Sequence, residues 1–584
     1  MWEAHYMLLH WLAKLCLIPF DICSMDSSMI ESTLLVTNIV ESCKVYLSNT
    51  GPAREAAAVC LSSLLTRPDM DGRHLSDFMT WAMALLDRWV YTSGYERSSL
   101  SANYFLVLGA MHSLFQIHKL GQRHKLLPFA SKLLPYLLAL NDEHSQTAVR
   151  KLISKLVQRI GMNYLPPRVA SWRYLRGQRS LNLLSCNRDV VAPVKNDCAD
   201  GLEDQDDRQD DVVTSDLEDA LDSLLCSMKD KDTVVRWSAA KGLGRITMRL
   251  SRNHAADVVD AVLEAFEEDG ADSSWHGGCL TLAELARRGL LLPERLADVM
   301  PILERAIRFD VMRGQHSIGA HVRDSACYVC WAFSRAYSPT VMAPFLNELT
   351  AALLTTALFD REVNCRRAAS AAYQETVGRQ GNQNVPFGID ILTVADYVSV
   401  GNRAVCFIAL AAKVVALDER MRASFISHLV GTTLKHWDRD MRDLGAKGLA
   451  SLVPGNPSTA AVELPCLVTG CTSPALNMRH GSIVAVSELL FALTTCGFDL
   501  LDVQINSILD VVGAVEKGRL YRGRGGELVR EAVCQLVGSI ARSKVAVTVK
   551  QQVLMVETLN EHLRQPHEAV QRAAREALRE FLFT

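Results

Sequence analysis

The sequence lacks the short motifs that mark the common catalytic and nucleotide-binding folds. It contains no Walker A phosphate loop, no H-E-x-x-H zinc-protease motif and no G-x-G-x-x-G in a strand–helix context. Residues 275–278, Trp-His-Gly-Gly, could pass for an esterase oxyanion loop, but the G-x-S-x-G motif that an esterase also needs is missing. The histidines and carboxylates form no catalytic constellation. We therefore predict no catalytic residues, no cofactor and no metal site.

Regular cysteine spacing is missing as well. The sixteen cysteines follow neither a disulfide framework nor a zinc-binding pattern. Cys327 and Cys330 form a C-x-x-C pair, but it lies inside an apolar helical run and no second pair follows at zinc spacing. These features favour buried, reduced thiols in a cytoplasmic protein.

The apolar start of the chain, MWEAHYMLLHWLAKLCLIPF, makes a poor signal peptide. Its acidic Glu3, the interrupting Lys14 and the missing small-residue cleavage site all argue against one. The apolar run is too short to span a membrane, and we predict no membrane insertion. One helical face would carry Leu8, Leu9, Leu12, Leu15 and Cys16. We predict a buried helix that ends before Pro19.

What the sequence does contain is a repeat. A short polar turn is followed by an apolar residue, an arginine and small residues that open a helix. The arginines of this pattern are Arg54, Arg150, Arg236, Arg323, Arg366, Arg442, Arg479, Arg530 and Arg572. From Arg236 onward their spacing is close to about 40 residues or twice that, which is the HEAT/armadillo range. We predict an all-α, HEAT/armadillo-type α-solenoid of two-helix repeats.

Two stretches fill the double-length gaps of this repeat. The residues 275–278 are predicted as a turn, with the second helix of their repeat supplied by the stretch after them, CLTLAELARRG. Arg403 fills the gap between Arg366 and Arg442. We expect the repeated arginines to pair with turn aspartates, such as Asp230 or Asp360, of their own or the adjacent repeat.

An acidic stretch divides the chain. Between Asp197 and Asp219 there are eleven acidic residues and one base, Arg208, so the rest of the chain carries a net charge of +7. Because the stretch also has few large apolar residues, we predict a disordered linker over 185–215. HEAT-like helical repeats are predicted on both sides of it, over 1–184 and 216–584.

Two basic stretches could bind anionic partners. PPRVASWRYLRGQRS, residues 166–180, interleaves arginines with Trp172 and Tyr174, a pattern that can bind nucleic acid. We predict instead a helix with solvated arginines and no nucleic-acid partner. The glycine-rich stretch YRGRGGEL, residues 521–528, could approach a partner's backbone or phosphate, or could simply be a turn before the Arg530 helix.

Longer strings are more specific than the repeat. They include WHGGCLTLAELARRGLLLP, VRDSACYVCWAFSRAY, FDREVNCRRAASAAYQETVGRQG, FGIDILTVADYVSVGNR, HWDRDMRDLGAKGLASLVP, MRHGSIVAVSELL, LYRGRGGELVREAVC, YMLLHWLAKLCLIPFDI and VASWRYLRGQRSL. In these strings the chain resembles the tubulin-folding cofactor D family, also called tubulin-specific chaperones D. The resemblance extends over essentially the whole chain. It departs at GNQNVP, which is longer than in the family, and at Phe387, where the family has histidine.

The resemblance implies a cytoplasmic, non-catalytic chaperone, which could also associate with the cytoskeleton or the centrosome. Its implied partners are β-tubulin, the α/β-tubulin dimer, the tubulin cofactors C and E and an Arf-like small GTPase. With the other cofactors it would assemble and take apart tubulin dimers and promote GTP hydrolysis on tubulin. A long concave solenoid surface is compatible with a folded client.

Six polar residues in the most specific strings are predicted to contact a partner. They are Arg367, Arg379, Asn402, Arg403, Arg522 and Arg524. Three alternatives stay open: a generic HEAT-repeat scaffold or adaptor, an enzyme on a helical scaffold, and a non-functional truncation. The last arises because family members continue the solenoid on both sides of this region, so that the chain is expected to be a truncated or partial form.

Overall fold

The computed structural model describes residues 2–22, 34–70, 73–91, 101–141, 146–176, 214–267, 270–314 and 316–583. The chain forms two compact units, Met1–Ala306 and Ile307–Thr584. Most of the predicted linker, 185–215, lies outside the described residues, so the boundaries at 184/185 and 215/216 stay a prediction. At the end of that range, Ser215 already begins a helix.

The regular elements described in the first unit are all helices, with short 3₁₀ turns between some of them. Its elements are α1 (Trp2–Leu15), α2 (Leu34–Leu47), α3 (Ala53–Leu65), η2 (Pro68–Met70), α4 (His74–Tyr91), α6 (Ser101–Leu120), α7 (Arg123–Leu140), α8 (Thr147–Tyr164), α9 (Ser215–Met228), α10 (Thr233–Thr247), α11 (Arg252–Leu263), η4 (Glu264–Phe266), α12 (Asp272–Arg287), η5 (Pro293–Arg295) and α13 (Leu296–Ile307).

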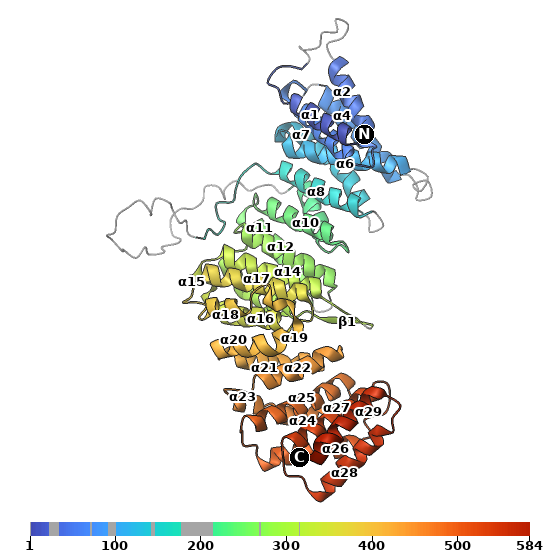
Figure 1. The fold of residues 1–584 in the computed structure, drawn as a ribbon. Coiled ribbons are helices and arrows are strands. Elements are labelled where there is room, and N and C mark those ends of the chain that lie inside the picture. Colours follow the sequence, from blue (N-terminus) through green and yellow to red (C-terminus); the bar gives the residue numbers. More distant parts are fainter. Residues whose placement is uncertain are drawn as a thin grey trace, which may run out of the picture. The chain divides into compact units, whose positions relative to one another are not determined.

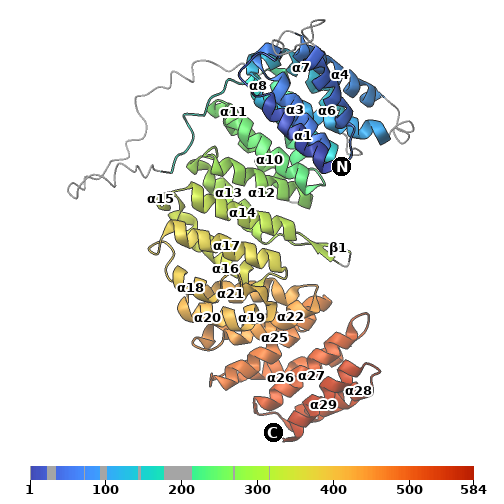
Figure 2. The same cartoon turned by 45° about the horizontal axis from the view of Figure 1, so that its top comes forward.

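These helices form two layers. In one layer α1, α3, α6, α8, α10 and α12 pack side by side in chain order (Figure 2). In the other layer α2, α4, α7, α9 and α11 each pack on a helix of the first. Every two-helix repeat thus buries its apolar stripes against its own partner and its neighbours.

The second unit continues with the same kind of repeat and adds one small hairpin. Its elements are β1 (Val311–Arg313), β2 (His316–Ile318), α14 (Ala320–Ala336), α15 (Pro339–Met342), η6 (Ala343–Phe345), α16 (Leu346–Phe359), α17 (Val363–Gln380), α18 (Gly388–Val394), η7 (Ser399–Gly401), α19 (Arg403–Val405), the π-helical η8 (Cys406–Leu410), α20 (Ala411–Leu417), α21 (Met421–Gly431), η9 (Thr433–Lys435), α22 (Arg439–Ser451), α23 (Pro457–Ala461), α24 (Leu464–Gly470), α25 (Leu476–Thr495), α26 (Asp502–Lys517), α27 (Gly526–Arg542), α28 (Val549–Leu563) and α29 (Glu568–Phe583).

This unit is layered in the same way. One layer runs from α14 to α17 and, beyond the segment η7–α20, through α22, α25, α27 and α29 (Figure 1). The helices α16, α21, α24 and α28 pack against it. The antiparallel hairpin β1–β2, which pairs Val311 with Ile318, precedes α14. The predicted HEAT/armadillo solenoid is confirmed, and the hairpin is the one departure from an all-helical fold in the described residues.

The apolar faces of the helices form the core. In α9, Leu217, Leu224 and Met228 are buried. In α10, the buried apolar residues include Val235, Ala239, Leu243 and Ile246. Small residues let the helices approach each other. A Cβ on Gly242 would lie 3.2 Å from Leu224 Cδ1, so this position has little room for a larger side chain.

Two local predictions need correction. The predicted N-terminal helix exists as α1. It buries Leu9 and Ala13, and Cys16 is buried just after its end. Leu8 and Leu15 are exposed, because α1 packs against α3 with the face that carries Leu9 and Ala13. Residues 166–176 of the basic stretch are not helical. They run across the ends of α10 and α12, where the Ala170 and Tyr174 amides donate to the Met248 and Gly289 carbonyls. These bonds replace the helical ones. Pro166 and Pro167 have no amide hydrogen to continue α8, and each disfavours the helical region at the residue before it.

One helical stretch, Pro339–Phe359, is long and apolar enough to cross a membrane by length and composition. Within the described residues no other helix meets that criterion. Its apolar window is 61% buried inside the fold, as is usual for a core helix of a solenoid.

Candidate functional site

Six of the nine repeated arginines are buried: Arg150, Arg236, Arg323, Arg366, Arg442 and Arg479. Arg54 and Arg530 are half-buried, and Arg572 is exposed. In four repeats the guanidinium donates to the carbonyls five and six residues earlier, in the turn before its own helix. These arginines are Arg236, Arg366, Arg442 and Arg479. The predicted aspartate pairing is right for Arg150, 2.7 Å from Asp230, and for Arg323, 2.6 Å from Asp360. For Arg236, Arg366, Arg442 and Arg479 the turn backbone takes the place of the carboxylate, and Arg530 lies 3.6 Å from Glu561, which is not a turn aspartate.

The Trp-His-Gly-Gly stretch belongs to the same packing scheme. It lies in the first turns of α12, which begins at Asp272, so the predicted turn at 275–278 is wrong. The Arg236 Nε donates to His276 Nδ1 at 2.9 Å. A Cβ on Gly277 would lie 1.9 Å from the Met228 carbonyl oxygen. The stretch is therefore a close contact between neighbouring repeats, with no role as an oxyanion loop.

The same Arg–His–Gly contact recurs in the second unit. Arg442 Nε donates to His480 Nδ1 at 3.1 Å, and a Cβ on Gly481 would lie 1.8 Å from the Leu434 carbonyl oxygen. Burial, together with Arg442 and Arg439, lowers the pKa of His480 to about 3. The imidazole must stay neutral at Nδ1 to accept this hydrogen bond.

Acidification should therefore weaken the second unit. A histidine whose folded pKa lies below the unfolded value of about 6.5 stabilises the fold above that pH, and the stability is lost as the pH falls toward the folded pKa. Lowering the pH from about 7 to about 5 should reduce the free energy of unfolding by about 2 kcal/mol through His480. Urea unfolding of His480→Gln should show a correspondingly shallower pH dependence. His567→Gln, at an exposed position, serves as the control, and equal slopes for both variants would contradict the assignment.

Residues 396–405 form a rigid, exposed platform beside the start of α17. Arg366 donates to the Val400 carbonyl at 2.8 Å and to the Gly401 carbonyl at 2.9 Å. The Ser399 hydroxyl and amide donate to Asp396, and these bonds lower the pKa of that carboxyl. With its backbone fixed in this way, the platform leaves Tyr397 51%, Val398 75% and Val405 41% exposed.

Arginines border these apolar side chains. The Arg367 guanidinium lies 5.0 Å from the centroid of the Tyr397 ring, a cation–π distance that orients the ring. Arg403, which starts α19, lies 3.9 Å from Asp438 and 3.9 Å from Asp440. The Asn402 side chain caps α19 by accepting from the Val405 amide at 3.2 Å.

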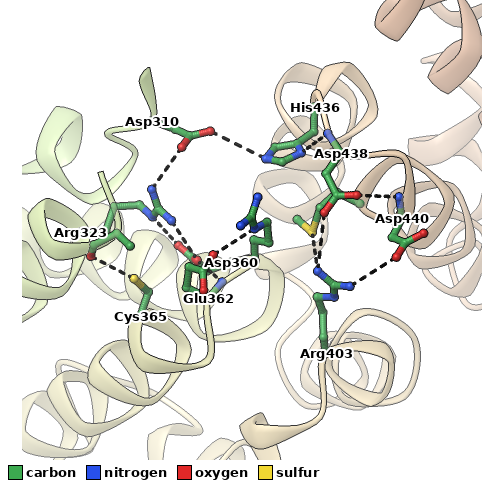
Figure 3. Close-up of polar contacts among 12 residues, drawn as sticks. Asp310, Arg323, Asp360, Glu362, Cys365, Arg403, His436, Asp438 and Asp440 are labelled. Atoms are coloured by element: carbon green, nitrogen blue, oxygen red, sulfur yellow. Dashed lines mark hydrogen bonds and ion pairs between the residues drawn. The ribbon is translucent and has the colours of Figure 1, made fainter. Parts of the chain in front are cut away.

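A polar network ties the platform to the turns of the neighbouring repeats (Figure 3). Arg323 bridges Asp310 and Asp360, and His436 lies 3.7 Å from Asp310. The Asp438 amide donates to His436 Nδ1 at 3.0 Å, and Asp438 in turn faces Arg403. Through Asp438 and His436, Arg403 therefore links the platform to the turns of the neighbouring repeats.

Comparison with known proteins identifies the family. A family model described as "Tubulin-specific chaperone D-like, ARM repeats" matches residues 148–389, and one described as "Tubulin-specific chaperone D-like, ARM repeat" matches 1–86. A Dictyostelium discoideum protein named tubulin-specific chaperone D is 33% identical over an alignment of 574 residues, which covers 92% of this chain and 38% of that protein. The chain belongs to the tubulin-specific chaperone D family.

Other family relatives and solved structures agree to different degrees. A Schizosaccharomyces pombe protein named tubulin-folding cofactor D is 28% identical over 529 residues, 88% of this chain and 44% of that protein. The chain thus spans less than half the length of these two relatives. A crystal structure of importin beta aligns with 99% of this chain and 67% of its own, at 13% identity and a TM-score of 0.40. A likeness this low supports no statement about function.

The predicted contact residues fall into separate places. Arg367, Asn402 and Arg403 meet at the platform. Arg379 lies twelve residues further along α17, about 18 Å away at the helical rise, and pairs with Glu375 at 2.8 Å. Arg522 and Arg524 are exposed in the turn between α26 and α27. Of the six, Arg367 and Arg379 lie within the stretches that the family models match. Their roles in binding stay a prediction.

The sequence analysis missed the apolar residues of the platform. Tyr397 and Val398 do not fit the apolar spacing of a helix and are flanked by turn-forming residues. This pattern is the signal by which they could have been recognised as exposed apolar residues. The burial predicted for the C-x-x-C pair is confirmed, since Cys327 and Cys330 are 1% and 0% exposed. Burial raises the pKa of the Cys327 thiol well above its usual value. No group of three potential metal ligands is found in the described residues.

Proposed function

We propose that this chain is a tubulin-folding chaperone that binds β-tubulin and takes part in the assembly and disassembly of α/β-tubulin dimers. The observation that carries the proposal is the match of 92% of the chain to a relative named for tubulin. In this proposal it works in the cytoplasm, and at the cytoskeleton or centrosome, with tubulin cofactors C and E and an Arf-like small GTPase. Together with the cofactors it promotes GTP hydrolysis on tubulin and contributes no catalytic site of its own.

We assign the client contact to the platform 396–405. Exposed tyrosine and arginine on a fixed backbone are the composition of protein-binding hot spots, because such side chains bury a large area and lose little entropy on binding. Tyr397 and Val398 supply the apolar centre, and Arg367 and Arg403 supply a polar rim. Bound tubulin would bury Tyr397 and Val398, which are exposed in the described part of the chain.

The first test is co-elution of the purified chain with α/β-tubulin in size-exclusion chromatography, followed by affinity measurement. Val398→Asp is expected to weaken tubulin binding about tenfold or more, because it places a charge in the apolar centre. Val462→Asp is the matched control, since Val462 is 75% exposed like Val398 and also lies in the second unit. Circular dichroism should show equal helicity for both variants.

Two results would count against this proposal. If the unaltered helical chain never shifts tubulin, the generic scaffold is the better account. If tubulin binds and both valine variants bind it equally, the platform is not the client surface.

A further inference from the structure

The turn between α26 and α27 presents four cations to solvent. Lys517, Arg519, Arg522 and Arg524 are all exposed, and among the described residues no hydrogen bond or ion pair joins their side chains to an acidic partner. Glu516 and Glu527 border the turn at half-buried positions, while the four cations are exposed. The exposed cations would attract an anionic partner.

Backbone hydrogen bonds close this turn: the Leu520, Arg522 and Gly526 amides donate to the Val515, Arg519 and Gly523 carbonyls. Arg519, Gly523 and Gly525 have φ values of 50°, 94° and 85°, in the left-handed region. For Arg519 this is a strained conformation, of the kind that recurs at binding sites. A Cβ on Gly526 would lie 1.9 Å from the Tyr521 carbonyl oxygen, so helix α27 starts tightly against the turn.

Tyr521 anchors the centre of the turn. Its side chain is buried, the Arg530 guanidinium lies 4.4 Å from its ring centroid, and the His562 ring packs edge-on at 5.1 Å. The cations on either side of this anchor therefore project from a fixed support. The backbone of the turn is thus ordered before a partner binds, so the entropy cost of binding falls on the long cationic side chains.

The chemistry of the turn favours carboxylates. Arginine forks match carboxylate and phosphate geometry, and three of the four cations are arginines. The aromatic ring of the turn is buried, so no exposed face is offered for stacking bases. No large exposed apolar side chain of the described chain lies between Val503 and Val549, so the turn has nothing to insert into a membrane.

We propose that the turn Lys517–Arg524 binds an acidic, extended segment of a protein partner through its carboxylates. This deepens the proposed function, since the client would supply the segment. That the segment belongs to tubulin rests on the proposed function, whereas binding of an acidic peptide does not.

The test measures fluorescence anisotropy of a labelled glutamate-rich peptide with the full chain, without tubulin. Arg522→Glu/Arg524→Glu should raise the dissociation constant about tenfold or more, since it replaces two attractions by two repulsions. Lys413→Glu/Lys550→Glu makes the same charge change at exposed positions of the second unit and should leave it within about twofold. Raising salt from about 0.05 M to about 0.15 M should weaken binding, because the contacts are exposed.

Three results would overturn the proposal: equal affinities for both double variants, equal binding of a glutamine version of the peptide, or tighter binding of single-stranded DNA that is lost in the Arg522→Glu/Arg524→Glu variant. The last would make the turn a nucleic-acid surface. Because the assay contains no tubulin, a chain that fails to bind tubulin leaves these outcomes unaffected.

Discussion

Arg442→Met is expected to lower the free energy of unfolding around α22 and α25 by about 3 kcal/mol or more. Arg442 is 1% exposed. Its guanidinium donates to the carbonyls of His436 and Trp437 at 2.7 and 3.0 Å and to Asn477 at 3.1 Å. Methionine keeps most of the apolar stem but supplies no donor. These part-buried carbonyls then lose the guanidinium donor, and so does the buried His480 Nδ1.

Hydrogen exchange of the α22 and α25 amides is the appropriate measurement, because solenoid repeats can open locally and one global value would average over them. Protection should fall in these helices first. Arg564→Met, at an exposed position in the same unit, should change protection by less than about 0.5 kcal/mol. A change below about 1 kcal/mol for Arg442→Met would mean that the turn carbonyls find other donors, and the packing role of the repeated arginine would be wrong.

The repeated arginine also shows where sequence reasoning succeeds and where it stops. Its spacing of about 40 residues and the small residues after it predicted the solenoid, because periodic burial of helices leaves a periodic pattern. Its partner could not be predicted for Arg236 or Arg442. Every residue has a backbone carbonyl, so the residue types do not reveal which carbonyls accept from the guanidinium. The geometry of the turn decides it.

The candidate site divides in the same way. Arg367, Asn402 and Arg403 were selected from a specific string, and they do meet at one platform. Tyr397 and Val398 were not selected, because their exposure depends on the 3₁₀ turn η7 that follows them, whose Val400 and Gly401 carbonyls accept hydrogen bonds from Arg366. Arg379 came from the same string, but the helix carries it away from the platform. Asn402 and Arg403 lie near Arg367 because the chain turns back after α17, whereas Arg379 lies near the far end of that helix.

Gly481→Ala is expected to destabilise the second unit by about 3 kcal/mol, the upper end of overpacking effects. The added Cβ would lie 1.8 Å from the Leu434 carbonyl oxygen. Because that atom belongs to the backbone of η9, no rotamer change can relieve the clash. Either η9 moves away from α25 or α25 shifts along it, and both disturb the Arg442–His480 hydrogen bond.

Gly378→Ala provides the matched control. Gly378 also lies inside a helix, α17, but an added Cβ there would meet nothing within 4 Å. Since alanine is the better helix former, this variant should be stabilised by about 0.5 to 1 kcal/mol. Denaturant unfolding of the two variants should therefore shift the midpoint in opposite directions. If Gly481→Ala left the unfolding midpoint unchanged, neighbouring repeats could shift past each other at little cost. The close approach at each His-Gly pair would then not be required for packing.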